Sequence, residues 1–131
     1  MSEAPVHIFT LPKKERIYLK EDISRLMREG RYGVLAQMKY SFAPGSGHLY
    51  NRIMVSVGKK FFKRAVKRNL LKRRIREAYR LNKNLLPPQG IDILFIYSSK
   101  EILSSESIAE LVVKALGEIS ERTSEKKEER S

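Results

Sequence analysis

The chain has 131 residues, enough for one domain with its own hydrophobic core, and its formal net charge is +12. It contains no cysteine, which excludes disulfides, thiolate-based zinc or iron–sulfur sites, and cysteine nucleophiles. No apolar run is long enough to span a membrane and the first residues lack a secretory pattern, so we expect a cytoplasmic protein without membrane contact.

The first predicted elements are a short helix and two strands. Apolar residues three and four apart, from Ile23 to Met27, precede a capping Gly30 and predict the helix. Apolar and polar residues then alternate in two stretches, 34–42 and 49–57, with the turn sequence Pro-Gly-Ser-Gly between them. This pattern predicts two half-buried strands that pair as a hairpin.

The following elements are a helix, a strand and a last helix. The segment 59–83 has helical periodicity to about Leu81, and two consecutive prolines further on prevent its continuation. Residues 91–97 are apolar on both faces except for one aspartate, which suits a central strand. Ser104 can cap a last helix, whose apolar stripe runs through 108–119.

Together these elements predict an α+β fold in one domain, residues 1–131. We expect a small sheet of about four strands with helices packed on it, in the order α-β-β-(β)-α-β-α. The polar ends, 1–12 and 122–131, are expected to be flexible.

Charge is concentrated in one helix. Residues 59–83 hold twelve Lys or Arg against one acid, Glu77, which leaves 15 basic and 14 acidic residues elsewhere. Like charges repeat every four residues from Arg68 to Arg80, and each such pair destabilises a helix by about 0.2–0.5 kcal/mol. A polyanion would neutralise this repulsion, and arginine suits bidentate contact with phosphate. The segment therefore predicts nucleic-acid binding.

The pattern favours RNA over DNA and a binding role over catalysis. The sequence shows no helix-turn-helix partner, leucine zipper or zinc ligands, whereas a basic helix beside an open sheet suits structured and single-stranded RNA. His7 and His48 lie in predicted irregular segments, and Asp92 and Glu77 are single carboxylates; Glu77 is expected to pair with an arginine of its own helix, Arg73 or Arg80. We expect neither a catalytic group nor a metal site in the polypeptide.

The central motif resembles that of the bacterial RNase P protein subunit. The stretch 52–80, RIMVSVGKKFFKRAVKRNLLKRRIREAYR, contains the family pattern Ala-Val-x-Arg-Asn-x-x-Lys-Arg-x-Ile-Arg-Glu. The matching positions are Ala65, Val66, Arg68, Asn69, Lys72, Arg73, Ile75, Arg76 and Glu77. Looser agreement at 13–30 and 87–97 extends the resemblance to roughly residues 13–120.

The resemblance implies a small basic protein that assembles with RNase P RNA. In that family the RNA holds Mg²⁺ and hydrolyses the phosphodiester that releases the 5′ leader of precursor tRNA, so the endoribonuclease chemistry belongs to the RNA. No obligatory protein partner is expected. The family fold has a left-handed βαβ crossover, although handedness rules alone favour a right-handed one.

The resemblance also implies two binding regions. The RNA-binding residues are expected on the basic helix and the link before it: Lys59, Lys60, Lys63, Arg64, Lys67, Arg68, Asn69, Lys72, Arg73, Arg76 and Arg80. The leader of precursor tRNA is expected in a cleft between that helix, the sheet face and the first helix, with the candidates Ile23, Met27, Tyr32, Met38, Tyr40 and Tyr50. Core packing is the alternative for about half of the apolar residues in the strand that carries Met38 and Tyr40.

The chain departs from the family pattern at several positions. Leu70 replaces a usual arginine, and Arg74 stands where the family is apolar, which would restore the charge at a shifted position. The first helix has Ile23 and Met27 where the family tends to have Phe, so base contacts through these two residues should be weaker or based on shape. Tyr32, Tyr40 or Tyr50 could supply the missing ring. A structural rRNA-binding or ribosome-assembly protein is the alternative function, and it need not leave the sheet face open.

Overall fold

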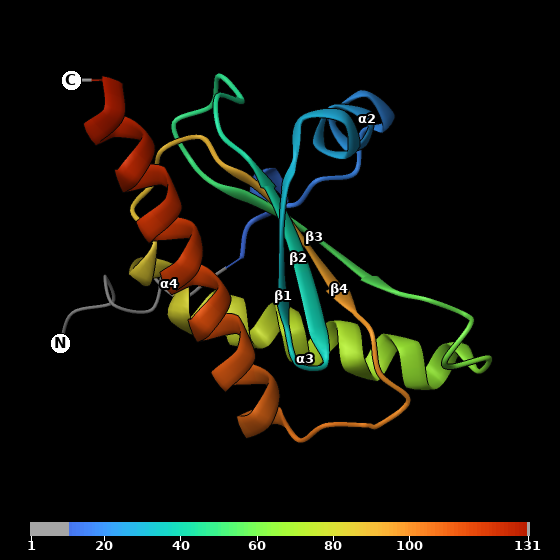
Figure 1. The fold of residues 1–131 in the computed structure, drawn as a ribbon. Coiled ribbons are helices and arrows are strands. Elements are labelled where there is room, and N and C mark those ends of the chain that lie inside the picture. Colours follow the sequence, from blue (N-terminus) through green and yellow to red (C-terminus); the bar gives the residue numbers. More distant parts are fainter. Residues whose placement is uncertain (1–10, 131) are drawn as a thin grey trace, which may run out of the picture.

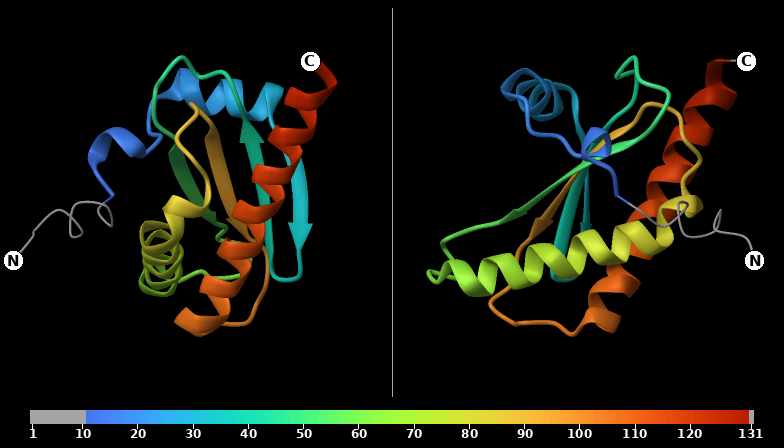
Figure 2. Two further views of the ribbon diagram at one scale, coloured as in Figure 1. Left: turned by 90° about the vertical axis from the view of Figure 1, so that its left-hand side faces the viewer. Right: turned by 180° about the vertical axis from the view of Figure 1, so that it is seen from behind.

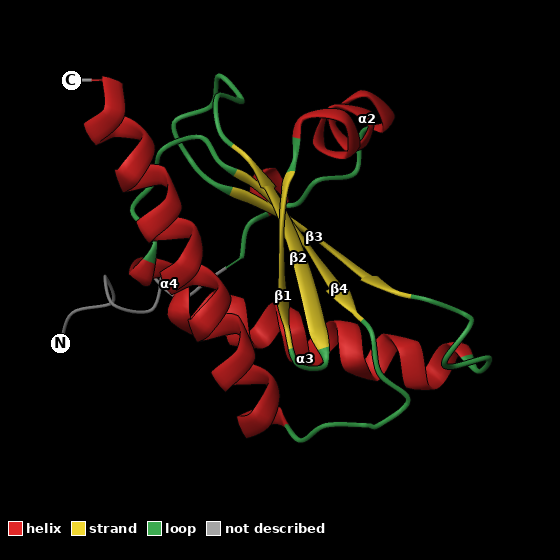
Figure 3. Ribbon diagram, viewed as in Figure 1, coloured by secondary structure: helices red, strands yellow, loops and turns green. Residues whose placement is uncertain are grey.

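A computed structural model describes residues 11–130 and confirms the α+β class (Figures 1 and 3). Its elements are η1 (Lys13–Glu15), α2 (Lys20–Glu29), β1 (Arg31–Leu35), β2 (Met38–Ala43), β3 (Arg52–Val57), α3 (Ala65–Asn82), η2 (Lys83–Leu85), β4 (Asp92–Tyr97) and α4 (Ser105–Arg130). Ser104 Oγ accepts a hydrogen bond from the Ser107 N–H at 3.2 Å, which confirms the predicted cap. Of the ends predicted to be flexible, 1–10 and 131 lie outside the described residues, and 122–130 continue α4.

The strands form a mixed sheet in the order β1-β2-β4-β3. β2 pairs antiparallel with β1 and β4, and β3 pairs parallel with β4, so β4 lies inside the sheet as predicted. The β3–α3–β4 segment is thus a βαβ unit, and its left-handed sense stays a prediction. Because β4 separates β2 from β3, the predicted hairpin between stretches 34–42 and 49–57 is wrong.

A two-residue turn explains the error. The stretch 34–42 reads as one alternating strand, but Leu35 pairs with Met38 across a reversal in which Ala36 has a φ of 43°. The turn places Val34 on the sheet face opposite to Met38 and Tyr40, although sequence alternation assigned the three to one face. A two-residue turn without its usual glycine or asparagine carries no clear sequence signal.

One face of the sheet is covered by α3 and α4, which cross each other in Figures 1 and 2. Buried Phe95 of β4 contacts the ring of Tyr79 from α3, with the ring centroids 6.2 Å apart. Tyr40 of β2 is fully buried beside α4, and its hydroxyl donates to Glu118 at 2.5 Å. A Cβ on Gly33 would lie 2.2 Å from the Tyr40 ring, so this strand position requires glycine.

Within residues 11–130, the opposite face is covered only at one end, where α2 packs. A small apolar cluster of Ile17, Leu26, Ala43 and Leu94 joins α2 to β2 and β4. Strand register aligns Tyr32, Ser41, Leu94 and Met54 in one row on this face. This unequal coverage produces a packed core on one side and an accessible sheet surface on the other.

Candidate nucleic-acid interface

The α3 helix separates an apolar face from a basic face, as predicted. Leu71, Ile75, Ala78 and Tyr79 are buried against the sheet and α4. The cations of the other face are exposed or half-buried, and so are those of the link at 59–64. The first turn of α3 contains no acid, although several cations lie at this positive end of the helix dipole. The helix therefore presents a surface that attracts anions.

Arg68 has a role that the sequence did not predict. Its guanidinium donates to the carbonyl oxygens of Phe62 and Lys63, each at 2.7 Å. Phe62 is itself buried, and its ring lies 6.1 Å from that of Tyr97. Arg68 therefore holds the basic link against the start of α3, and its expected contact with RNA stays a prediction.

Two more arginines of α3 have partners within the protein: Arg80 near the end of the helix and Arg74 near its middle. Arg80 forms an ion pair with Glu77 at 2.8 Å, which confirms one of the two predicted partners of this acid. Hydrogen bonding from Arg80 lowers the pKa of Glu77. Arg74 donates to the carbonyl oxygen of Leu103 at 2.6 Å, and the idea that it restores charge to the RNA face stays a prediction. It ties α3 to the loop before α4 because its position faces that loop.

Leu70 changes the chemistry of the basic face. It is half-buried, and it lines an apolar hollow of about 410 Å³ together with Val66, Asn69 and Arg73. Val66 is 79% exposed. The basic helix thus has a small apolar surface at Leu70, the position where the family pattern has a cation.

The N-terminal segment adds cations that the sequence analysis did not single out. Arg16 forms a parallel bridge with Ile53, and the next residue donates its N–H to the Ile53 carbonyl oxygen at 2.7 Å. This contact brings Arg16 beside the basic face of α3, where it lines a cavity of about 270 Å³ with Leu11, Arg73, Arg76, Glu77 and Arg80. Burial and the charge of Arg16 lower the pKa of Arg76. The looser agreement of residues 13–30 with the family pattern was the one sequence feature that could have indicated a role for Arg16.

A buried ionic network holds α2 on the sheet. Asp92 is fully buried and accepts hydrogen bonds from Arg52 at 2.7 and 2.8 Å and from Arg25 at 3.2 Å. Arg52 also contacts Asp22 of α2 at 3.1 Å. Its hydrogen bonds to Asp92, and then to Asp22, raise the pKa of Arg52. Because Arg25 and Asp22 both belong to α2, the network sets the position of this helix over the sheet.

Three of the predicted cleft residues lie around the accessible sheet face. Met27 of α2 is 57% exposed and Tyr32 of β1 is 52% exposed, while Ile23 is partly buried at the base of α2. The second row of this face contains Val34 and Lys39, which are both exposed, and the partly buried Ile96 and Ser56. Among the described residues this face therefore stays open beyond α2, and it combines exposed apolar and aromatic side chains with one lysine.

The other three cleft candidates lie elsewhere. Met38 and Tyr40 are buried in the core on the opposite face, because the turn at Ala36 reverses their orientation, so their assignment to the cleft was wrong. Tyr50 precedes β3 and lines a separate cavity with Tyr79 and other residues. Its ring contacts His48 and the ammonium group of Lys14 rather than the open sheet face, so this assignment was also wrong.

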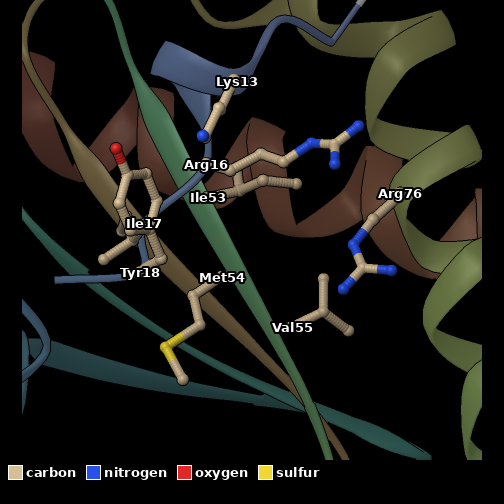
Figure 4. A pocket seen from close by; sticks show the side chains of 8 residues that line it. All are labelled: Lys13, Arg16, Ile17, Tyr18, Ile53, Met54, Val55 and Arg76. Carbon is tan, nitrogen blue, oxygen red and sulfur yellow. The ribbon is translucent and has the colours of Figure 1, made fainter.

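Tyr18 is an exposed aromatic residue that the sequence analysis missed. It is 62% exposed and lies just before α2, with the Lys13 ammonium 5.7 Å from its ring centroid. Figure 4 shows it in a pocket at the edge of β3, which we call the β3-edge pocket. Its volume is about 400 Å³, and its lining includes Lys13, Arg16, Tyr18, Met54, Val55 and Arg76. Because Tyr18 is a single tyrosine outside any periodic pattern, the sequence does not indicate that it lies at this strand edge.

Within residues 11–130, no group of three His, Cys, Asp or Glu side chains could hold a metal ion. The side chain of Asp92 is engaged by two arginines, and His48 is exposed in a loop. None of the helices in this part of the chain combines the length and apolarity needed to cross a membrane.

Comparison with known proteins gives nearly the same range as the sequence resemblance, which covered roughly residues 13–120. A family model described as Ribonuclease P matches residues 11–120. The ribonuclease P protein component of Porphyromonas gingivalis is 49% identical over 80 residues, which cover 60% of this chain and 58% of that protein. The corresponding protein of Petrotoga mobilis is 41% identical over 66% of this chain and 71% of its own length. The matched region thus spans less than two thirds of the first of these relatives.

Solved structures share the arrangement of helices and strands. The RNase P protein of Thermotoga maritima superposes with a TM-score of 0.68 and is 30% identical, covering 78% of this chain and 94% of that chain. The RNase P protein of Staphylococcus aureus has a TM-score of 0.67 at 24% identity, covering 81% and 94% of the two chains, which supports the fold alone.

Proposed function

This chain belongs to the ribonuclease P protein family, and from that premise we propose that it is the protein subunit of a bacterial ribonuclease P. It binds the catalytic RNA subunit and the 5′ leader of precursor tRNA, and it assists the endonucleolytic removal of that leader in the cytoplasm. No other protein is required for this role. The observation that carries the proposal is the juxtaposition of a basic helix face with an accessible sheet face that exposes Tyr32 and Val34.

The basic face of α3 is proposed to contact the RNA subunit. Arg73 is exposed, while Lys72 and Arg76 are half-buried, and no ion-pair partner for these three occurs among the described residues 11–124. Phosphates would remove the repulsion between them, and the released counterions would contribute to the free energy of binding. The link held by Arg68 extends the same positive surface.

The open sheet face is proposed to hold the leader. Met27, Tyr32 and Val34 are exposed around it, and a single-stranded segment can bring unstacked bases against such side chains. A purely structural rRNA-binding protein has no need for an accessible apolar surface beside its basic helix. This feature therefore favours leader binding over the alternative role in ribosome assembly.

The hydrolysis itself is proposed to occur in the RNA. Residues 11–130 offer no set of carboxylates or imidazoles suited to Mg²⁺, so the ions required for hydrolysis are assigned to the RNA subunit and the substrate. The protein contributes by neutralising phosphates and by holding the leader in place. Both effects raise substrate affinity without a protein side chain at the reacting phosphodiester.

Reconstitution tests this function directly. Purified protein is added to a bacterial RNase P RNA and labelled precursor tRNA at a Mg²⁺ concentration too low for the RNA alone. We expect cleavage at the mature 5′ end, and a Lys114→Gln variant should behave like wild type because this exposed residue lies on α4. Failure to restore cleavage, together with tight and specific binding to rRNA fragments, would favour the ribosomal alternative.

A further inference from the structure

Two guanidinium groups converge at the edge of β3 without an acidic partner. Arg16 approaches from the segment before α2 and Arg76 from α3, and both line the β3-edge pocket (Figure 4). Within residues 11–124 neither forms an ion pair, and the Arg16 guanidinium makes one hydrogen bond, to the Leu11 carbonyl oxygen at 3.4 Å. Two unpaired cations held together by the fold form a site for an anion.

The other side of the same strand edge is apolar and aromatic. Met54 points to the face opposite to Ile53 and Val55 because side chains alternate along a strand. Figure 4 shows Tyr18 and Met54 on one side of β3, and the guanidinium groups of Arg16 and Arg76 on the other. Tyr18 is 62% exposed, so its ring is available for stacking, and the Lys13 ammonium lies 5.7 Å from the ring centroid.

We propose that the β3-edge pocket binds one unstacked nucleotide of a single-stranded RNA that crosses this edge. Its phosphate lies between Arg16 and Arg76, and its base stacks on Tyr18 beside Met54. The pocket volume of about 400 Å³ falls in the range of small-ligand sites. The proposal deepens the proposed function and rests on it, because it assigns a nucleotide site at the boundary between the basic helix and the open sheet face.

Binding of a short oligouridine to the full chain tests the pocket without the catalytic RNA. Tyr18→Ala should weaken binding about 5–150-fold, the usual effect of losing one stacked base, whereas Tyr18→Phe should retain the affinity. Arg16→Gln and Arg76→Gln should each reduce the salt slope of log K by about 0.7, as expected for one lost phosphate contact. Lys114→Gln removes the same charge on α4 and should change neither quantity. Affinities and slopes equal to wild type in all three pocket variants would overturn the proposal.

A spectroscopic readout separates stacking from a loss of folding. The chain has no tryptophan, so Tyr18→Trp introduces a single indole at the pocket. Its fluorescence should be quenched by oligouridine at the affinity of the wild-type protein, because a larger ring retains the stacking surface. Binding without any change in this fluorescence would exclude contact between the base and position 18.

Two sources of the strand are distinguished in the reconstituted holoenzyme. If the nucleotide belongs to the leader, the Tyr18→Ala defect in KM disappears when the leader is shortened to one nucleotide. If it belongs to the catalytic RNA, the defect persists and Tyr18→Ala also weakens binding to that RNA. Wild-type protein that fails to restore cleavage, while the pocket variants still lose oligouridine affinity, would refute the proposed function and leave the nucleotide site intact. If wild type restores cleavage and the pocket variants bind oligouridine with wild-type affinity, the nucleotide site is refuted and the proposed function is retained.

Discussion

Replacement of Asp92 by asparagine should destabilise the protein strongly. This near-isosteric change removes the charge that faces Arg52 at 2.7 and 2.8 Å and Arg25 at 3.2 Å. The carboxylate is fully buried, and the side chains of Arg52 and Arg25 are 8% and 19% exposed, so water replaces little of the lost interaction. Breaking a buried pair from one side costs about 3–5 kcal/mol. Because Arg52 retains Asp22 at 3.1 Å, we expect the lower end, about 3 kcal/mol.

Urea unfolding at neutral pH measures this loss, and thermal unfolding gives an independent value. For 131 residues the unfolding entropy is about 0.3 kcal/mol/K, so a loss of about 3 kcal/mol lowers Tm by about 10 °C. The matched control is Glu77→Gln, since the Glu77–Arg80 pair has side chains 55% and 32% exposed and exposed ion pairs contribute little to stability. If Asp92→Asn costs no more than this control, the buried network does not hold α2 in the way described.

Three further predictions address the RNA surface and the core. The double variant Lys72→Gln, Arg73→Gln should reduce the salt slope of log K for RNase P RNA by about 1.4–1.8, and an unchanged slope would move the RNA surface elsewhere. Asn69→Ala should weaken RNA affinity about 2–12-fold in a filter-binding assay, the equivalent of one net hydrogen bond, whereas wild-type affinity would make the exposed amide a solvated group. Burial raises the pKa of Tyr79 above its ordinary 10.0, so the folded state keeps the hydroxyl proton up to a higher pH than the unfolded state does. Stability should therefore fall as pH rises above about 10, and Tyr79→Phe should flatten this fall in urea unfolding; identical alkaline slopes would refute the assignment.

Local sequence patterns were sufficient for most individual elements. The three-and-four spacing of apolar residues predicted the long helices, because an amphipathic helix buries one stripe wherever it packs. The apolar run at 91–97 predicted an internal strand, since nearly all of its side chains, on both faces, are buried. The concentration of charge in 59–83 predicted the basic surface, because so many cations cannot be buried without partners.

Strand pairing and the composition of the binding surface depended on the tertiary structure. The reversal at Ala36 changed the faces of Met38 and Tyr40, since a two-residue turn shifts the alternation that a continuous strand would have. Arg16 and Tyr18 reached α3 and β3 only because the segment before α2 pairs with the edge of the sheet. The sequence alone therefore determined which helices and strands form and where the positive charge is concentrated, since both depend on neighbouring residues. Which side chains share a pocket or a face was decided by the fold, because these contacts join residues far apart in the chain through strand register and packing.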